Sequence, residues 1–562
     1  MPFGPAAAPT LFTVEIYPYE GGHYTLQGGQ ILRAIVRKNL RDIQPGTFQI
    51  ELAPGGPGGT ESSPTWSEII TPQSFVLLGG QRGNSAAVML AGVVTTVSET
   101  QQWQTSDDGT QAARRQTILG QDFTWFFNSF NWYALAYLGL TAGAALGPAG
   151  IPVLLNDGLV GGSSSADSNP ARVGAGWYQN VMAGASGILG NTYLPYQGSQ
   201  VPFRTAVSTI WEQYSNVFIP FGDFYWASEG SWSAKFDAIF PRPFYEFFVA
   251  TAPSGAYSST VATANNLGAA GQQFSMAALP AAAAAGPVVV ARVNPTPTLN
   301  ATVPGAGSTP ILAPGLDMSR WTQLPLYDFT AAPFGFLNSA VGFNSDDARN
   351  FYMLNPTWQR AMFGDNNGNI SPFLYYMAGM GDARSIGRYG YRPQIGTIRW
   401  LADLNGNAAQ NVTLNIAQSV ATLTAVMASW YQPLPMMARG TVTIPFSPDV
   451  LIGSRFRYQP FKGQLPWDFY IEEVVHEFLF GGPSNTTLAL SRGLPQAVYA
   501  DSAAGGKLEA LHLGTAGRVD GAYTVVSGAS TPALTPLSSP ESIKAFLGNI
   551  AAIYVSPQAG GG

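Results

Sequence analysis

The chain has 562 residues, no cysteine and a net charge of −6, and only 11% of its residues are charged. The missing cysteines exclude disulfides and thiolate chemistry, and the acidic balance excludes a surface whose main task is gripping a nucleic-acid backbone. Ordinary soluble domains carry roughly 25% charged residues. We therefore expect about three or four domains from the length, with much of their surface facing other protein subunits.

Residues 1–122 are predicted to form a first β unit. Leu11–Ile16 alternates apolar and polar residues, as a half-buried strand does. Turn-rich stretches, such as 53–59 and 107–109, separate further short runs, and this spacing indicates a sandwich or a small barrel. The further strand-like runs are Gly29–Arg37, Thr47–Leu52, Ser74–Leu78, Ala86–Val97 and Arg115–Leu119.

Residues 123–380 are predicted to be a mixed middle region. Thr205–Asn216 has apolar residues at helical spacing and predicts an amphipathic helix. Val261–Pro314 contains a single charged residue, Arg292, and indicates long loops around a strand at Pro287–Val293. We expect part of these loops to pack on a neighbouring subunit, because long structureless loops are uncommon inside compact domains.

The stretch Phe123–Asn156 has no charged residue and is long enough to span a bilayer. Asn128, Gly143 and Pro148 interrupt it, and flanking basic anchors are missing. A buried or interface helix followed by a loop is therefore favoured over a membrane span. Residues 1–6 carry no basic region followed by an apolar run, so no secretory signal is expected.

Residues 381–498 are predicted to form a helix followed by a second β unit. Ala408–Trp430 has a broad apolar face, and Pro433 is expected to end this helix. Residues 499–562 read as a loose extension with one short helix that begins at Pro540. The two β units share a similar strand rhythm without a clear sequence repeat. The strands predicted for the second unit are Arg439–Pro445, Arg455–Gln459, Asp468–Leu479 and Asn485–Arg492.

The second β unit resembles a known family. Four segments occur in the order found in the final barrel of phage tail hub proteins, a family that includes contractile-tail hubs, late control protein D and the N-terminal part of type VI spike proteins. These segments are Gly440–Asp449, Leu451–Phe456, Phe469–Phe478 and Asn485–Gly493. Less specific matches precede them in the family's order, at Leu119–Phe123, Phe240–Phe248 and Ser345–Tyr352.

This resemblance implies both a fold and a role. The expected fold is β-rich α+β, with two tube-protein-like β-barrel domains that bracket the mixed middle region. The expected role is structural: a baseplate hub at the tip of the tail, in the virion, where three copies form a pseudo-sixfold ring with a channel for DNA. The implied partners are further copies of the chain, the tail tube or distal tail protein, the central spike, a tape-measure protein and other baseplate subunits. DNA is expected to pass through without specific binding.

The chain has only three histidines, which are His23, His476 and His512. His476-Glu477 begins like a zinc-protease HExxH motif, but Phe480 stands where the second histidine is required. The spacing from Glu473 to His476 resembles half of a di-iron motif. However, an odd offset on a strand points the two side chains to opposite faces, so they cannot share a metal.

Paired carboxylates could serve a glycosidase, and the candidates are Asp346, Asp347, Asp365 and Asp468. Asp346 and Asp347 are better explained as acidic residues at the start of a helix over Ala348–Leu354. Asp365–Asn369 resembles part of a calcium loop but lacks the closing glutamate, so a turn is favoured.

Aromatic side chains cluster at Trp211, Tyr214, Phe218, Phe221, Phe224, Tyr225 and Trp226. They could form a carbohydrate platform, but we favour a core or a subunit interface, where aromatics are enriched. We therefore predict no catalytic, cofactor-binding or metal-binding residue and no enzyme activity. The alternative is a tail-tip component that binds or degrades cell-wall carbohydrate.

Overall fold

The structure is a computed structural model, and it describes the larger part of the two β units and parts of the middle region. The described residues are 9–18, 20–40, 44–57, 64–106, 109–129, 131–132, 230–231, 233, 245–253, 256–257, 274–280, 283–302, 311–317, 320–330, 337–356, 380–381, 383–398, 427–461 and 466–496. The predicted helix at 205–216, the aromatic cluster at 211–226, Asp365, His512 and the extension at 499–562 lie outside them.

The described part of the chain is rich in strands and has few helices. The strands are β1 (Thr10–Tyr17), β2 (Tyr24–Gln27), β3 (Ile31–Asn39), β4 (Thr47–Leu52), β5 (Phe75–Arg82), β6 (Ser85–Ser106), β7 (Gly109–Asp122), β8 (Asn131–Trp132), β9 (Gly230–Ser231), β10 (Tyr245–Ala252), β11 (Gly286–Val293), β12 (Thr298–Thr302), β13 (Ile311–Asp317), β14 (Leu326–Asp328), β15 (Asn338–Gly342), β16 (Phe351–Pro356), β17 (Met380–Gly381), β18 (Pro393–Ile398), β19 (Ala438–Pro445), β20 (Arg455–Tyr458), β21 (Trp467–Leu479) and β22 (Asn485–Pro495). The helices are α1 (Trp66–Ile69), α2 (Thr124–Ser129) and α8 (Ala383–Tyr389), with short 3-10 turns at η1 (Gly28–Gln30), η8 (Trp321–Gln323), η9 (Ser345–Asp347) and η12 (Leu434–Met436).

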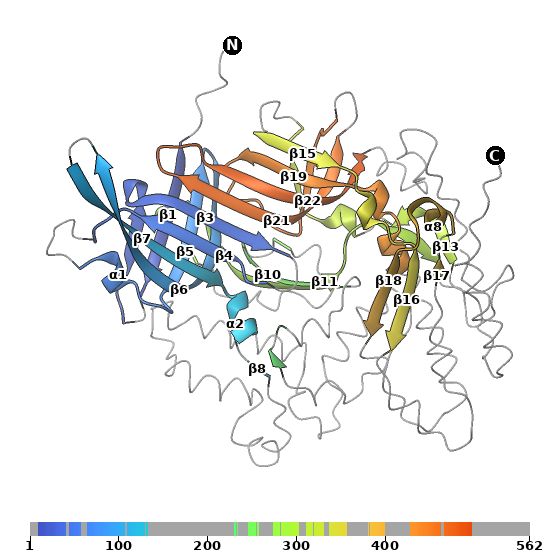
Figure 1. Ribbon diagram of the computed structural model, residues 1–562, viewed down its shortest axis with the longest axis horizontal. Helices are drawn as coiled ribbons and strands as arrows, with labels where there is room; N and C mark the ends of the chain where they lie inside the picture. The colour runs from blue at the N-terminus through green and yellow to red at the C-terminus, as the bar shows by residue number, and fades with distance from the viewer. Residues whose placement is uncertain are drawn as a thin grey trace, which may run out of the picture.

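Strands from both ends of the chain form one 13-stranded sheet (Figure 1). Its order is β15-β19-β22-β21-β3-β4-β7-β6-β5-β1-β2, with β20 paired to β21 and β14 paired to β20. All neighbours are antiparallel except β14 and β20, which run parallel. The predicted β-rich character is thus present. β3 and β21 are neighbours in this sheet and join the two predicted units.

The first β unit curls around an apolar core. In the strand order β1 and β21 are separated by β3, β4, β7, β6 and β5, yet the rings of Phe12 on β1 and Phe478 on β21 stack at 5.3 Å. A flat sheet would hold these strands far apart, since neighbouring strands lie about 4.8 Å from one another. The buried cluster takes residues from every strand from β1 to β7 and also includes Phe446 and Phe478 from the second unit.

The two β units repeat the same strand connectivity. In chain order, β15, β19, β20, β21 and β22 correspond to β3, β4, β5, β6 and β7, so the second unit also takes in β15 from before residue 381. Four pairings correspond: β20–β21 with β5–β6, β21–β22 with β6–β7, β22–β19 with β7–β4 and β19–β15 with β4–β3. β14 lies beside β20 as β1 lies beside β5, but β14–β20 is parallel and β1–β5 is antiparallel. The repeat therefore lies in the backbone, where sequence comparison detected only a strand rhythm.

Backbone details at the entry to β5 and β20 support this correspondence. Gln73 and Gly453 have nearly the same positive φ, +71° and +70°. Each is followed by a fully buried serine, Ser74 or Ser454, which begins the pairing with the next strand. Positive φ is uncommon outside glycine, so the coincidence marks two equivalent turns.

A bulge occurs at the same place in both units. The β6–β7 register shifts between Val94 and Thr96, and the β21–β22 register shifts between Ile471 and Glu473. Such a bulge adds one residue to one strand and increases its twist. The two bulges align β6 with β21 residue by residue, so that Val94 corresponds to Ile471.

The described middle region consists mainly of small sheets. β10 pairs with β11 and contacts β6, β12 pairs with β13, and β16 lies between β17 and β18. The helix predicted over Ala348–Leu354 is wrong, because residues 351–356 form β16 in parallel with β18. The preceding acidic pair lies in the turn η9, which Asn344 caps by accepting from the Asp346 amide at 2.8 Å. Tertiary pairing outweighs local helix propensity here.

Two further helix predictions are only partly covered. Of the predicted helix at 408–430, the described residues are helical and end at residue 431, before Pro433. Of the apolar stretch at 123–156, α2 and β8 are described. Within the described residues, no helix is both long and apolar enough to cross a membrane.

Candidate functional site

The seam between β3 and β21 joins the two β units and contains the polar cluster that the sequence singled out. The strands pair antiparallel from Glu473 opposite Asn39 to Leu479 opposite Arg33. Two further hydrogen bonds close its ends, from the Leu40 amide to the Glu472 carbonyl and from the Phe480 amide to the Leu32 carbonyl, both 3.0 Å. Side chains on the seam alternate between an outer, half-exposed face and an inner, buried face.

The outer face carries paired charges. Arg33 on β3 donates to Glu477 on β21 at 2.7 Å, and Arg37 binds Glu473 in the same way. Glu51 on β4 also approaches Arg33, at 4.0 Å. Because these groups are partly solvated, each pair contributes about 0–1 kcal/mol. Their arrangement fixes the register of the seam more than it stabilises the fold.

The inner face buries an amine and a carboxylate. Lys38 Nζ donates to Thr251 Oγ1 at 3.0 Å and lies 3.5 Å from Asp122 Oδ2. Asp122 also accepts from the Thr124 amide at 2.9 Å. Burial lowers the pKa of Lys38 and raises the pKa of Asp122, while their mutual attraction opposes both shifts. The three side chains tie β3, the end of β7 and β10 together.

His476 lies on the same inner face and is 5% exposed. Its Nδ1 is 3.0 Å from Thr486 Oγ1 on β22, and the ring of Phe446 lies edge-on at 5.9 Å. Burial, together with the charge of Lys38, lowers the pKa of His476 to about 3, so its imidazole is neutral at physiological pH. Glu473 belongs to the opposite face, which confirms the prediction from their odd spacing.

A cavity of about 240 Å³ lies against the inner face, where the two units meet the middle region. The polar residues of its lining include Lys38, Thr251, Tyr327, Asp449 and His476, and the rest of the lining is mostly apolar. Tyr327 Oη donates to the Asp449 carbonyl at 2.7 Å and accepts from the Leu451 amide at 3.2 Å. These bonds hold the loop between β19 and β20 over the cavity.

A buried arginine ties the β10–β11 hairpin to the second unit. The side chain of Arg292 is fully buried and pairs with Glu246 at 2.9 Å. It also donates to the Gly453 carbonyl at 2.9 Å and to Tyr470 Oη at 3.0 Å. Its guanidinium lies 5.4 Å from the ring centre of Phe248. Full pairing compensates the cost of burying the charge.

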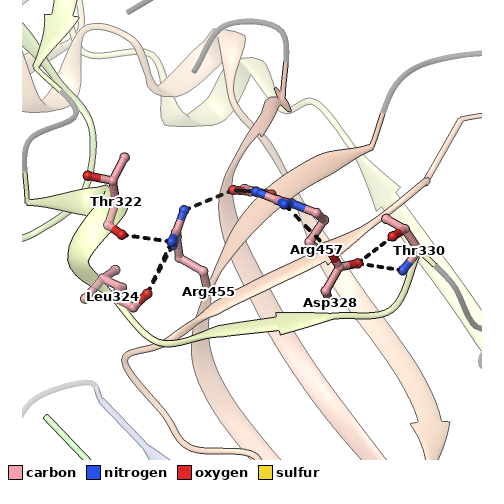
Figure 2. A network of polar contacts seen from close by, with 7 residues as sticks. Thr322, Leu324, Asp328, Thr330, Arg455 and Arg457 are labelled. Carbon is pink, nitrogen blue, oxygen red and sulfur yellow. Dashed lines mark hydrogen bonds and ion pairs between the residues drawn. The ribbon is translucent and has the colours of Figure 1, made fainter. Parts of the chain in front are cut away.

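Asp468, one of the candidate acids, is fully buried and held by two arginines. Figure 2 shows these arginines, Arg455 and Arg457, near Asp328. It accepts from Arg457 at 2.5 and 2.9 Å and from Arg455 at 3.2 Å. Arg455 also donates to backbone carbonyls before β14, and Arg457 approaches Asp328 at 3.7 Å. This network orders the approach to β14, and it presents Asp468 to protein cations instead of to a substrate.

The other described candidates are dispersed. Asp347 pairs with Arg439 on β19 at 2.7 Å, and Asp346 lies 3.8 Å from Arg392. His23 stacks on Tyr17 with ring centres 4.4 Å apart, in the first unit. Among the described residues, no group of three or more histidine or acidic side chains could hold a metal ion.

Sequence reasoning missed the roles of Lys38 and Arg292. Arg292 had a usable signal, because it is the single charge between Val261 and Pro314, and an isolated charge in an apolar strand is normally paired. Lys38 had a weaker one, since it continues the inward-facing pattern of Ala34 and Val36 on β3. Their partners come from distant segments, which no local pattern specifies.

No family model and no curated protein matches the chain. Similar solved structures include a tail protein from Neisseria meningitidis, with 11% identity over 86% of this chain and 96% of that chain and a TM-score of 0.32. A 43 kDa prophage tail protein from Shewanella oneidensis has 10% identity over 85% and 98%, with a TM-score of 0.33. A prophage tail protein from Listeria monocytogenes has 8% identity over 88% and 98%, with a TM-score of 0.34. TM-scores at this level do not decide the fold or the function of this chain.

Proposed function

We propose that the chain is a structural subunit of a phage-type tail, the baseplate hub at the tip of the tail tube. Three copies form a pseudo-sixfold ring that joins the tube to the central spike and leaves a channel for DNA. Each β unit acts as one tube-like barrel of that ring. The other proposed partners are the distal tail, tape-measure and baseplate proteins, and the virion tail tip is the location.

The observation that carries this proposal is the repeat within one chain. Two β units with the same strand connectivity lie side by side and share a sheet through β3 and β21. A subunit with two similar units contributes two similar faces, so three copies can match a sixfold tube while they present threefold symmetry to a spike. The resemblance of Gly440–Gly493 to hub proteins points to the same role.

The chemistry of the described residues also favours a structural role over catalysis. Lys38, Arg292 and Asp468 are each bound by protein groups that link separate segments. The low charge content, 11%, fits a surface that is covered by other subunits. Lys38 links the first unit to β10, and Arg292 links the β10–β11 hairpin to the second unit, as a rigid structural subunit requires.

Imaging the purified protein by electron microscopy, together with its mass in solution, tests the proposal. We expect rings of three chains with a central channel. A monomer that releases fragments from peptidoglycan would overturn the hub and support the alternative, a tail-tip component that degrades cell-wall carbohydrate. A monomer that binds peptidoglycan without cleaving it would support the binding form of that alternative.

A further inference from the structure

The seam within the chain joins the edge of β3 to the edge of β21. Because the two units repeat each other, β15 and β6 have corresponding edges. In the seam, β20 pairs with the first part of β21, and β3 then pairs with residues 473–479 on the same side of that strand. In the first unit, β5 pairs with β6 only as far as Val93. Of the strands that the structure describes, only β7 pairs with residues 96–106, here called the outer half of β6.

The outer half of β6 corresponds to the part of β21 that forms the seam. Because Val94 corresponds to Ile471, and each is followed by the bulge, Val97 and Thr100 correspond to Val474 and Glu477. With β7, this part of β6 forms a two-stranded ribbon that projects beyond the sheet (Figure 1). An isolated two-stranded ribbon is marginally stable in water, so a third strand beside it would stabilise it.

The strand that corresponds to β3 is β15, which lies at the edge of the sheet. Its first three residues are exposed, and the apolar residues that flank it, Leu337 and Phe343, are 59% and 49% exposed. An exposed strand edge with apolar flanks is an adhesive surface that natural proteins normally cover. Within the described part of the chain, β19 is its single strand neighbour.

We propose that the outer half of β6 pairs antiparallel with β15 of a second copy of the chain and so repeats the internal seam between copies. The correspondence of the two seams sets the register: Val97 lies opposite Phe343, Ser98 opposite Gly342 and Thr100 opposite Ala340. The two edges lie on different units, so the contact is head-to-tail. It deepens the hub proposed above, because three such contacts and three internal seams close a ring with six quasi-equivalent joints.

The chemistry of the second seam differs from that of the first. Thr96 and Thr100 stand where Glu473 and Glu477 stand in the internal seam. Asn338 and Gly342 occupy the positions of Arg33 and Arg37. The contact between copies thus lacks the outer-face ion pairs and depends on backbone hydrogen bonds and apolar burial. We therefore expect it to persist at high salt.

Disulfide cross-linking tests the register in the full chain, which has no cysteine of its own. Seam hydrogen bonds at Leu40–Glu472 and Phe480–Leu32 make Glu477 and Ile35 a non-hydrogen-bonded pair, in which side chains lie closest. The corresponding pair is Thr100 and Ala340, and both residues are exposed. The matched variant is therefore Thr100→Cys with Ala340→Cys.

The control variant, Ser98→Cys with Ala340→Cys, shifts the pair by two residues and separates the Cα atoms by about 7–8 Å, beyond ordinary disulfide reach. After mild oxidation, non-reducing gels should show at least about tenfold more covalent dimer and trimer for the matched variant than for the control. Each single-cysteine variant should give no trimer. Equal products from both variants, or none from the matched variant, would overturn the pairing.

Imaging separates this inference from the proposed function. Rings whose matched variant does not cross-link would refute the β6–β15 pairing and leave the hub standing. Matched cross-links in open filaments would support the pairing and refute the closed ring. A chain that stays monomeric, with no matched product at any concentration, would overturn both.

Discussion

The two β units share their connectivity but bury different chemistry. At the corresponding cross-strand position, Leu77 faces Ala91 in the first unit, and Arg457 faces Asp468 in the second. Leu77, Ala91 and Asp468 are each at most 1% exposed. The first unit holds a continuous apolar cluster and one buried ion pair, Lys38 with Asp122, whereas the second unit buries Asp468 between two arginines.

This difference shows that the shared topology does not depend on a shared core. Backbone features recur in both units, namely the left-handed turn at Gln73 and Gly453 and the bulge before Thr96 and Glu473. Buried ion pairs add little net stability, because desolvation offsets their attraction, but the loss of one partner is costly. At the position where Leu77–Ala91 corresponds to Arg457–Asp468, the second unit should therefore be the more sensitive of the two to single substitutions.

The largest expected effect comes from Asp468→Ala. This substitution leaves Arg455 and Arg457 without their common carboxylate, and we expect the free energy of unfolding to fall by about 3–5 kcal/mol. Urea denaturation measures it. Adding Arg457→Leu copies the apolar pair of the first unit and should recover part of the loss. A single variant within about 1 kcal/mol of the wild type would contradict the asymmetry between the units.

The two left-handed turns predict opposite effects for reciprocal changes. A Cβ on Gly453 would lie 2.8 Å from a guanidinium nitrogen of Arg292 and 2.9 Å from the ring of Phe248. Gly453→Ala should therefore cost about 2–3 kcal/mol. Gln73→Gly relieves the same backbone strain at an exposed site and should stabilise by about 0.5–1 kcal/mol. Thermal melting of both variants compares them, and destabilisation by Gln73→Gly would contradict the equivalence of the turns.

His476 should make the second unit sensitive to acid. Its pKa falls from an ordinary value of 6.5 to about 3 on folding, so the unfolded chain binds a proton that the folded chain excludes. The stability present above pH 6.5 is therefore lost as the pH falls from 6.5 toward 3, by about 2 kcal/mol at about pH 5. The charge of Lys38 on the inner face lowers the pKa of His476 in the same direction as burial.

The measurement is the free energy of unfolding at about pH 7 and about pH 5 for the wild type and for His476→Gln, compared with the shift expected from linkage. In His476→Gln, the free energy of unfolding should decrease less between the two pH values, by the amount assigned to His476. In Val475→Thr, whose side chain points to the outer face, it should decrease as in the wild type. An unchanged pH profile in His476→Gln would show that this histidine is not the acid-sensitive group.

The smallest expected effect lies on the outer face of the seam. Arg37→Ala removes a half-exposed ion pair with Glu473 and should cost less than about 1 kcal/mol, decreasing further with added salt. Urea denaturation at two salt concentrations measures this effect. If Arg37→Ala lowered the free energy of unfolding as much as Asp468→Ala, the outer face would stabilise the joint between the units. The expected difference between half-exposed and buried ion pairs would then be wrong.

Local sequence patterns predicted many of the strands of both units. Alternation and turn residues placed Thr47–Leu52 at its observed bounds and placed β1, β19, β20 and β21 within two residues of theirs. The same reasoning failed at residues 348–354, where pairing with β18 converts a predicted helix into a strand. It also did not predict β15. The sequence of β15 is short and polar and shows no strand pattern, and the strand forms through its pairing with β19.

The sequence alone determined the β-rich character, the opposite faces of Glu473 and His476, and the order of the segments that resemble hub proteins. These follow from local periodicity, which depends on neighbours in the chain. Only the tertiary structure decided that β3 joins β21, that the two units repeat one connectivity, and that Lys38 meets Asp122 and Thr251. Such contacts join residues far apart in the chain, and their free energy depends on packing and register that no local pattern encodes.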